Sequence, residues 1–320
     1  MIRELLIIDF IKPFLDIKEV KNGDEIYEFF KSICGKNDFN SLYILNFLYK
    51  FICSDEVAKR KSSAREFEDL FSVLFGGIVT DTQNRKNLQY EVSEFFANVK
   101  DKIAGNKREK ADIIFPNGYA LSLKTLITEN KEINMGSFEK KVLFDGLGLE
   151  SFLTERKNNS GIGLGSIPQF TKLLEVLKTA KKSEIFYERF RQMAKFIYGD
   201  DLLVAIKEND KLTLNFFSGS EIYEIFSSFC QNADLTKIVN RYEGNSLRID
   251  RDTLLKFCKR VVVLKFDRLQ NSVLELINEF DITLHKNYAK YFNGDKNVKN
   301  ETLQILKDLF ENFDKRLKNG

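Results

Sequence analysis

The stretch ADIIFPNGYALSLKTL, residues 111–126, is the strongest structural signal in this chain. Two apolar runs flank Pro116-Asn117-Gly118, and this arrangement predicts a β-hairpin with a three-residue loop. Glycine suits the last loop position because it adopts the left-handed backbone conformation without strain. In the register that such a loop imposes, residue 115 pairs with residue 119 and residue 113 with residue 121.

Side chains alternate between the two faces of a strand, so this register assigns every hairpin residue to a side. One face is entirely apolar or aromatic and is expected to be core; it comprises Ile113, Phe115, Tyr119, Leu121 and Leu123. The other face gathers an acid, a hydroxyl and an amine among small or aliphatic neighbours; it comprises Asp112, Ile114, Ala120, Ser122 and Lys124. A two-residue loop would mix the two sets, so burial of one face favours the longer loop.

An aspartate and a lysine that converge on one sheet face suit phosphodiester hydrolysis. The Asp112 carboxylate offers oxygen ligands, which the hard cation Mg²⁺ prefers. Such a metal lowers the pKa of a bound water and stabilises charge on a phosphate. The Lys124 ammonium can orient the attacking water or stabilise the charge that develops. The pair therefore predicts metal-dependent nuclease chemistry.

The residues Asp112 and Ser122-Leu123-Lys124 resemble the signature of the PD-(D/E)xK nucleases, which is common among type II restriction endonucleases. The resemblance is confined to this hairpin and the helix before it. Ala111 stands where the signature usually has proline, a minor departure. Ser122 stands where it has the second acid, and a hydroxyl cannot supply the same charge to a metal.

The family pattern also implies a metal-binding glutamate on the preceding helix, for which Glu66 and Glu68 are the candidates. Glu66 has a local explanation because it lies three residues after Ser63, the spacing of a capping box. Glu68 flanks the apolar stripe of the same helix and has no such role, so Glu68 is preferred. The alternative for either glutamate is a solvated charge on a helix surface.

By resemblance, the chain is expected to be a sequence-specific double-stranded DNA endonuclease that requires Mg²⁺, as type II restriction enzymes do. Asp112 and Glu68 would bind the metal, and Lys124 and Ser122 would complete the catalytic set. A homodimer is expected because two-fold symmetry matches palindromic DNA. A repair or junction-resolving nuclease of the same fold is one alternative. A non-catalytic DNA-binding or scaffolding protein is another, and the missing second acid favours it.

Two further segments are candidates for DNA contact, because arginine and asparagine suit guanine and adenine edges. The segment 156–169 has glycines without nucleotide-loop spacing, and its alternative is a flexible connector. The segment 241–251 has a salt-bridged turn that enters a strand as its alternative. The candidate residues are Arg156, Lys157, Asn158, Asn159 and Gln169 in the first segment, and Arg241, Asn245, Arg248 and Arg251 in the second.

The 320-residue chain is 43% hydrophobic and 30% charged, as is ordinary for a globular protein, and its net charge of +3 indicates no particular partner. A single histidine, His285, argues against a Ser-His-Asp triad. The four cysteines lack metal-site spacing and are expected to be free thiols. No signal pattern precedes the chain's first helix, and no segment approaches the roughly 20 apolar residues of a membrane helix. A cytoplasmic location without membrane contact is therefore expected.

The order of expected elements predicts an α/β (α+β) fold, with a central mixed β-sheet of restriction-endonuclease type flanked by helices. An N-terminal helical region is expected over residues 1–60 and a C-terminal one over 267–320. The catalytic core would span 61–266, with a helical insertion at about 134–198. Strands are expected at residues 202–206, 212–217, 246–249 and 261–266, and helices at 221–229 and 252–257.

Overall fold

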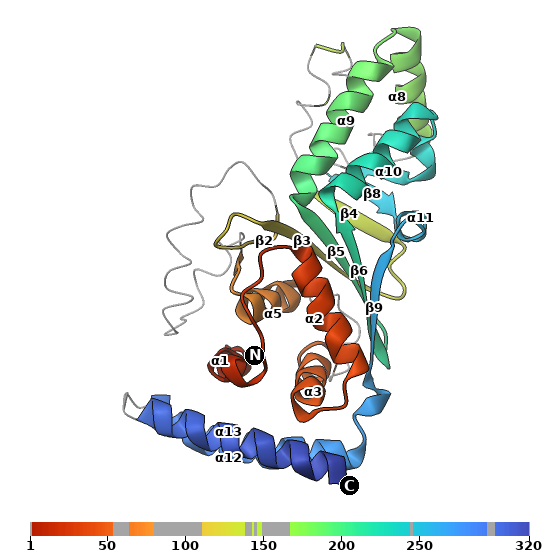
Figure 1. Cartoon of the computed structure of the whole chain (residues 1–320). Helices are drawn as coiled ribbons and strands as arrows, with labels where there is room; N and C mark the ends of the chain where they lie inside the picture. The colour runs from red at the N-terminus through yellow and green to blue at the C-terminus, as the bar shows by residue number, and fades with distance from the viewer. Residues whose placement is uncertain are drawn as a thin grey trace.

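A computed structural model describes residues 2–53, 64–79, 111–137, 143, 146–148, 167–243, 246–292 and 298–319. In these residues a central sheet lies between helical layers, and a smaller sheet lies beside it (Figure 1). The mixed α/β class with a mixed central sheet is therefore confirmed. Among the helices of these ranges, none combines the length and the apolar character that a bilayer crossing requires.

The central sheet has the strand order β1-β2-β3-β5-β6-β9. Its neighbours are antiparallel except β3 and β5, whose parallel pairing requires a long crossover connection. The expected strands at 202–206 and 212–217 are present, and the one expected at 261–266 ends at Lys265. The strands are β1 (Ile78–Val79), β2 (Ile113–Ile114), β3 (Ala120–Ile127), β5 (Asp201–Lys207), β6 (Lys211–Ser218) and β9 (Arg260–Lys265).

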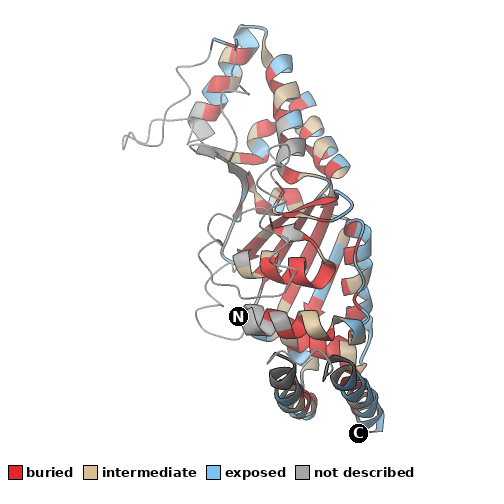
Figure 2. Cartoon of the chain, turned by 90° about the vertical axis from the view of Figure 1, so that its left-hand side faces the viewer, coloured by how far each residue is buried: buried red, intermediate tan, exposed pale blue. Residues whose placement is uncertain are grey.

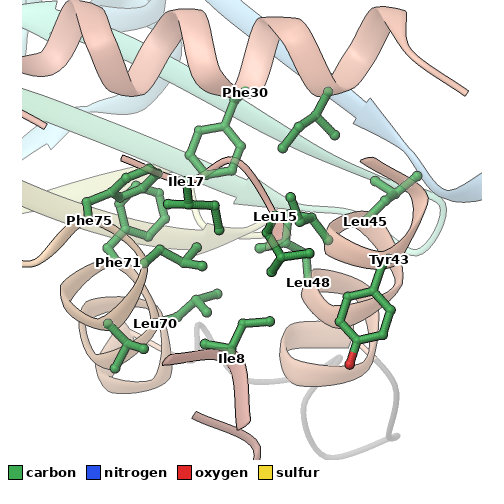
Figure 3. Close-up of a cluster of buried hydrophobic side chains, with 14 of the residues drawn as sticks. Ile8, Leu15, Ile17, Phe30, Tyr43, Leu45, Leu48, Leu70, Phe71 and Phe75 are labelled. Atoms are coloured by element: carbon green, nitrogen blue, oxygen red, sulfur yellow. The ribbon is translucent and has the colours of Figure 1, made fainter. Parts of the chain in front are cut away.

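One face of this sheet is covered by helices from both ends of the chain (Figure 1). Their buried side chains form a first core with the strands, and phenylalanine rings supply much of it (Figure 3). The rings of Phe30 and Phe75 both pack on Phe71, each with a centroid distance of 5.5 Å. The helices are α1 (Ile2–Ile11), α2 (Gly23–Gly35), α3 (Phe39–Cys53), α5 (Ala64–Phe75), α12 (Asn271–Phe292) and α13 (Val298–Asn319).

Helix α5 illustrates how the sequence directs this packing. Phe67, Leu70, Phe71 and Leu74 recur at helical spacing and are all buried. The helix ends at Gly76, whose φ of +81° is the left-handed conformation that stops a helix. The expected cap at Ser63 lies outside the described residues.

The opposite face of the sheet carries a second core, formed with the crossover helices and the small sheet. Strand β5 serves both cores, because Leu203 faces the first and Leu202 the second. Buried residues accordingly run along the strands and the inner helix faces (Figure 2). The remaining elements are α8 (Ile167–Thr179), α9 (Ser183–Tyr198), α10 (Gly219–Gln231), α11 (Arg251–Leu255), β4 (Glu132–Ser137), β7 (Val239–Glu243) and β8 (Ser246–Asp250).

One expectation in this region was wrong. The helical insertion expected from residue 134 does not begin there, since residues 134–137 belong to strand β4. The helix expected at 252–257 is present as a short one at Arg251–Leu255, capped where Asp250 accepts the Thr253 N–H at 2.8 Å. Strand β4 is stabilised by pairing with β8, which is more than a hundred residues away along the chain, and local periodicity does not report such a partner.

Candidate active site

The hairpin of residues 111–126 has the predicted register. Ile113 pairs with Leu121, and the Phe115 N–H donates to the Tyr119 carbonyl at 2.8 Å. Gly118 has a φ of +86°, so the loop uses glycine where a left-handed residue is needed. The three-residue loop is therefore confirmed.

The two faces of the hairpin also separate as predicted. The apolar residues lie in the first core beneath α5; they are Ile113, Phe115, Tyr119, Leu121 and Leu123. The alternation of β3 then places Ser122 and Lys124 on the opposite face, beside Asp112. The polar and charged candidate residues thus lie together on one face of the sheet.

Asp112 and Lys124 are in direct contact. The Lys124 ammonium donates to Asp112 Oδ2 at 2.9 Å, and the backbone N–H of Leu123 donates to the same oxygen at 2.7 Å. The side chains are 19% exposed for Lys124 and 22% for Asp112, so the pair is accessible but largely withdrawn from solvent. Two donors from β3 therefore hold the carboxylate in place just before β2.

Ser122 occupies the signature position of the second acid, and it is fully buried. Its backbone partner in the parallel neighbour strand is Leu202, a residue of the second core. A carboxylate at this position would be costly because it would lie among apolar side chains. The hydroxyl adds no charge to the site, so negative charge beyond Asp112 has to come from another element.

Glu68 lies on α5, next to the buried Phe67, and is partly exposed. Helix α5 packs on the apolar face of the hairpin, whereas Asp112 and Lys124 belong to the other face. A Glu68 carboxylate would have to reach the pair around the edge that β1 and β2 form. Its place in a metal site stays a prediction.

The donor set suits a metal that keeps much of its hydration. In the described part of the chain, no group of three or more His, Cys, Asp or Glu side chains surrounds a possible metal position. Mg²⁺ is commonly held by one or two carboxylates together with substrate phosphates and water, so Asp112 meets the lower end of that requirement. Asp112 therefore suits a Mg²⁺ that keeps most of its water ligands.

A tyrosine that sequence reasoning missed lies at this site. Tyr198 ends helix α9, is fully buried, and its hydroxyl has no hydrogen-bond partner among the described residues. Burial and then the negative charge of Asp112 raise the pKa of the Tyr198 phenol well above its usual value. No sequence pattern connects residue 198 to the hairpin; only the crossover brings them together.

The residues after Tyr198 attach α9 to the hairpin. A Cβ added at Gly199, whose φ is +67°, would lie 3.0 Å from the Ala120 Cβ and 3.2 Å from the Ala111 Cβ. Asp200 accepts the Ala120 N–H at 2.9 Å and donates its own N–H to the Ala120 carbonyl at 3.0 Å. The end of α9 is thereby seated directly on the strands that carry Asp112 and Lys124.

The tip of the hairpin is anchored on its apolar side by a buried polar contact. The Tyr119 hydroxyl donates to Asp201 Oδ2 at 2.7 Å, and the Gly23 N–H donates to the same oxygen at 3.0 Å. Burial raises the pKa of Asp201, although these donors and the Arg260 charge oppose the shift. Strand β5 and helix α2 thus clamp the hairpin at its turn.

Comparisons of the chain with protein-family models, with curated proteins and with solved structures find no match. The function of the site therefore has to be inferred from its own residues. The contact between Asp112 and Lys124 and the buried Tyr198 hydroxyl are the features that bear on it.

The expected DNA-contacting residues fall in different places. Residues 156–159 and Asn245 lie outside the described residues, and Gln169 is in α8. Arg241 and Arg248 are backbone partners in the β7–β8 ladder, so these two positions share one face of the small sheet. Arg248 is half-buried, and a DNA contact at these two positions stays a prediction.

Arg251 corrects one expectation. It is buried, and its guanidinium donates to the Thr128 carbonyl at 2.9 Å and to Asp252 at 2.8 Å. These bonds hold the β3–β4 turn against the start of α11. Arg251 is consequently engaged inside the fold and is not available to DNA in this structure.

Proposed function

We propose that this protein is a Mg²⁺-dependent endonuclease that hydrolyses phosphodiester bonds in double-stranded DNA, as type II restriction enzymes do. The observation that carries the proposal is the 2.9 Å contact between Lys124 Nζ and Asp112 Oδ2, made across two neighbouring strands on a partly open face. An ordinary surface ion pair contributes little to stability. Here the Leu123 backbone N–H also orients the carboxylate.

Each residue of the pair has a distinct part in this chemistry. Bound Mg²⁺ would supply charge neutralisation and a water of lowered pKa. Asp112 would hold the cation, with Glu68 as the proposed second carboxylate. Lys124 would turn its ammonium toward the attacking water and the phosphate oxygens, where negative charge develops. Ser122 would fill the remaining signature position, between the hairpin and the second core.

Incubation of purified protein with unmethylated plasmid DNA tests the proposal. Discrete fragments are expected with Mg²⁺, and none with excess EDTA. Fragments that form in EDTA would contradict the metal requirement. Cleavage at branched or damaged DNA only would instead indicate a repair or junction-resolving enzyme of the same fold.

A non-catalytic DNA-binding protein is the second candidate function, and the buried, neutral Ser122 favours it. In that case the Asp112–Lys124 pair would serve only to hold the end of β2 against β3. Specific DNA binding with no cleavage in Mg²⁺ or Mn²⁺, across a panel of DNA sequences, would decide for this candidate.

The paired positions Arg241 and Arg248 give a separate prediction for DNA binding. Replacing both arginines by alanine is expected to weaken DNA binding by about tenfold or more, because two cationic contacts are lost. Fluorescence anisotropy with a labelled duplex at fixed salt measures the change. The double variant Arg316→Ala/Lys318→Ala removes the same charge from α13 and should bind DNA as the wild-type protein does. Equal affinities of the two double variants would refute this contact.

A further inference from the structure

The hydroxyl of Tyr198 is an unusual group to keep in a protein interior. It is fully buried and has no hydrogen-bond partner among the described residues. A buried donor without a partner costs free energy, whereas phenylalanine would fill the same space without that cost. The ring alone therefore does not explain why a tyrosine stands here.

Two observations place Tyr198 beside the candidate active site. The next residue, Gly199, lies against Ala111, which precedes Asp112 in sequence, and against Ala120, which pairs with Ile114 two residues beyond Asp112. The Tyr198 ring belongs to the second core, on the sheet face that carries Asp112 and Lys124. Asp112 is also the charged group whose electrostatic effect reaches the phenol.

We propose that Tyr198 is a positioning residue of the metal site, which donates its O–H to the Asp112 carboxylate when that carboxylate holds a divalent cation. This inference rests on the proposed function, since it takes Asp112 to be the metal ligand. With a cation held at Asp112, the Lys124 ammonium would be repelled and could turn to the phosphate. The Tyr198 hydroxyl would then replace Lys124 as a donor to the carboxylate.

The phenol of Tyr198 is chemically suited to donate a hydrogen bond to a metal-binding carboxylate. Carboxylates that bind a metal are themselves oriented by hydrogen-bond donors around them, and loss of such a donor typically weakens metal binding by about 10- to 100-fold. A tyrosine phenol is a neutral donor near neutral pH, and burial raises the pKa of Tyr198 further. A neutral donor stabilises the ligand carboxylate without repelling the cation.

The variant Tyr198→Phe tests the proposal because it removes the hydroxyl and retains the ring. Isothermal titration calorimetry with Mn²⁺, in the absence of DNA, is expected to show an affinity about tenfold or more below that of the wild-type protein. The thermal unfolding midpoint without metal should be unchanged or higher, since an unpaired buried group has been removed. Lower metal affinity together with undiminished stability is a result that a purely structural tyrosine does not produce.

Two further variants complete the experiment. Tyr187→Phe, at another buried tyrosine of α9, should leave Mn²⁺ affinity unchanged, and Asp112→Asn should abolish it. Wild-type Mn²⁺ affinity in Tyr198→Phe overturns the proposal, as does Mn²⁺ binding that survives Asp112→Asn. If Mn²⁺ binding depends on Asp112 and Tyr198 but no DNA is cut, the nuclease function fails and the role of Tyr198 stands.

Discussion

Replacing Lys124 by methionine is expected to lower Mg²⁺-dependent DNA cleavage by about 100- to 1,000-fold while leaving DNA binding nearly intact. The ammonium stabilises charge that develops on the phosphate during the reaction, so its loss acts on the transition state and hardly on the ground state. Initial cleavage rates on plasmid DNA and anisotropy on a short duplex measure the two quantities.

The stability of this variant has to be measured as well. Lys124 is largely withdrawn from solvent, and its removal takes one donor from Asp112 while the Leu123 N–H remains. The expected loss is about 1–3 kcal/mol, between the values for exposed and buried ion pairs, so the variant stays folded.

The surface pair of Lys31 and Glu28 offers a matched control. Their contact is 3.3 Å long on α2, and both side chains are more than half exposed. Lys31→Met breaks a lysine–carboxylate pair on the other side of the molecule and should cut DNA at the wild-type rate. Unchanged cleavage in Lys124→Met would exclude Lys124 from catalysis and would favour the non-catalytic candidate.

The largest expected effect on stability comes from Phe71→Ala. Phe71 is fully buried in the first core, and its ring contacts those of Phe30, Phe67 and Phe75 (Figure 3). Loss of the ring leaves a cavity between α5 and α2 and should cost about 3–5 kcal/mol. This is a large part of the total of about 5–15 kcal/mol that is typical of a folded domain.

Thermal denaturation followed by circular dichroism measures this loss, which should lower the unfolding midpoint by roughly 10 °C. Phe257→Ala is the control, because Phe257 is 42% exposed and its removal leaves no closed cavity. The control should lose about 1 kcal/mol or less. Similar losses in the two variants would show that α5 does not pack on α2 as described.

Much of this architecture could be read from local sequence. The loop Pro116-Asn117-Gly118 set the hairpin register, and alternation along β3 then separated Lys124 from the apolar residues. Local sequence also predicted strands β5 and β6 and helix α10, each to within two residues at either end. Helix α10 begins two residues earlier than predicted, at Gly219, where Ser218 and Glu221 form a capping box by bonding each other's backbone N–H groups. Such features depend on residues a few positions apart, so the local sequence is enough to predict them.

Other parts depended on partners that are distant in sequence. The segment at 134–137 is a strand because β8 supplies its hydrogen bonds, and Arg251 is buried because the β3–β4 turn accepts its donors. No local periodicity encodes either partner. The packing of the core likewise decides which face of the sheet α5 covers. The role of Glu68 depends on that face.

The sequence by itself determined that an aspartate, a serine and a lysine share one face of a hairpin, because turn chemistry and strand alternation act over neighbouring residues. Only the tertiary structure decided what surrounds them. The parallel pairing of β3 with β5 buries Ser122, and the crossover through α9 delivers the Tyr198 hydroxyl to the same face as Asp112. Burial and the approach of remote side chains arise from long-range packing, so these features appear only when the whole chain has folded.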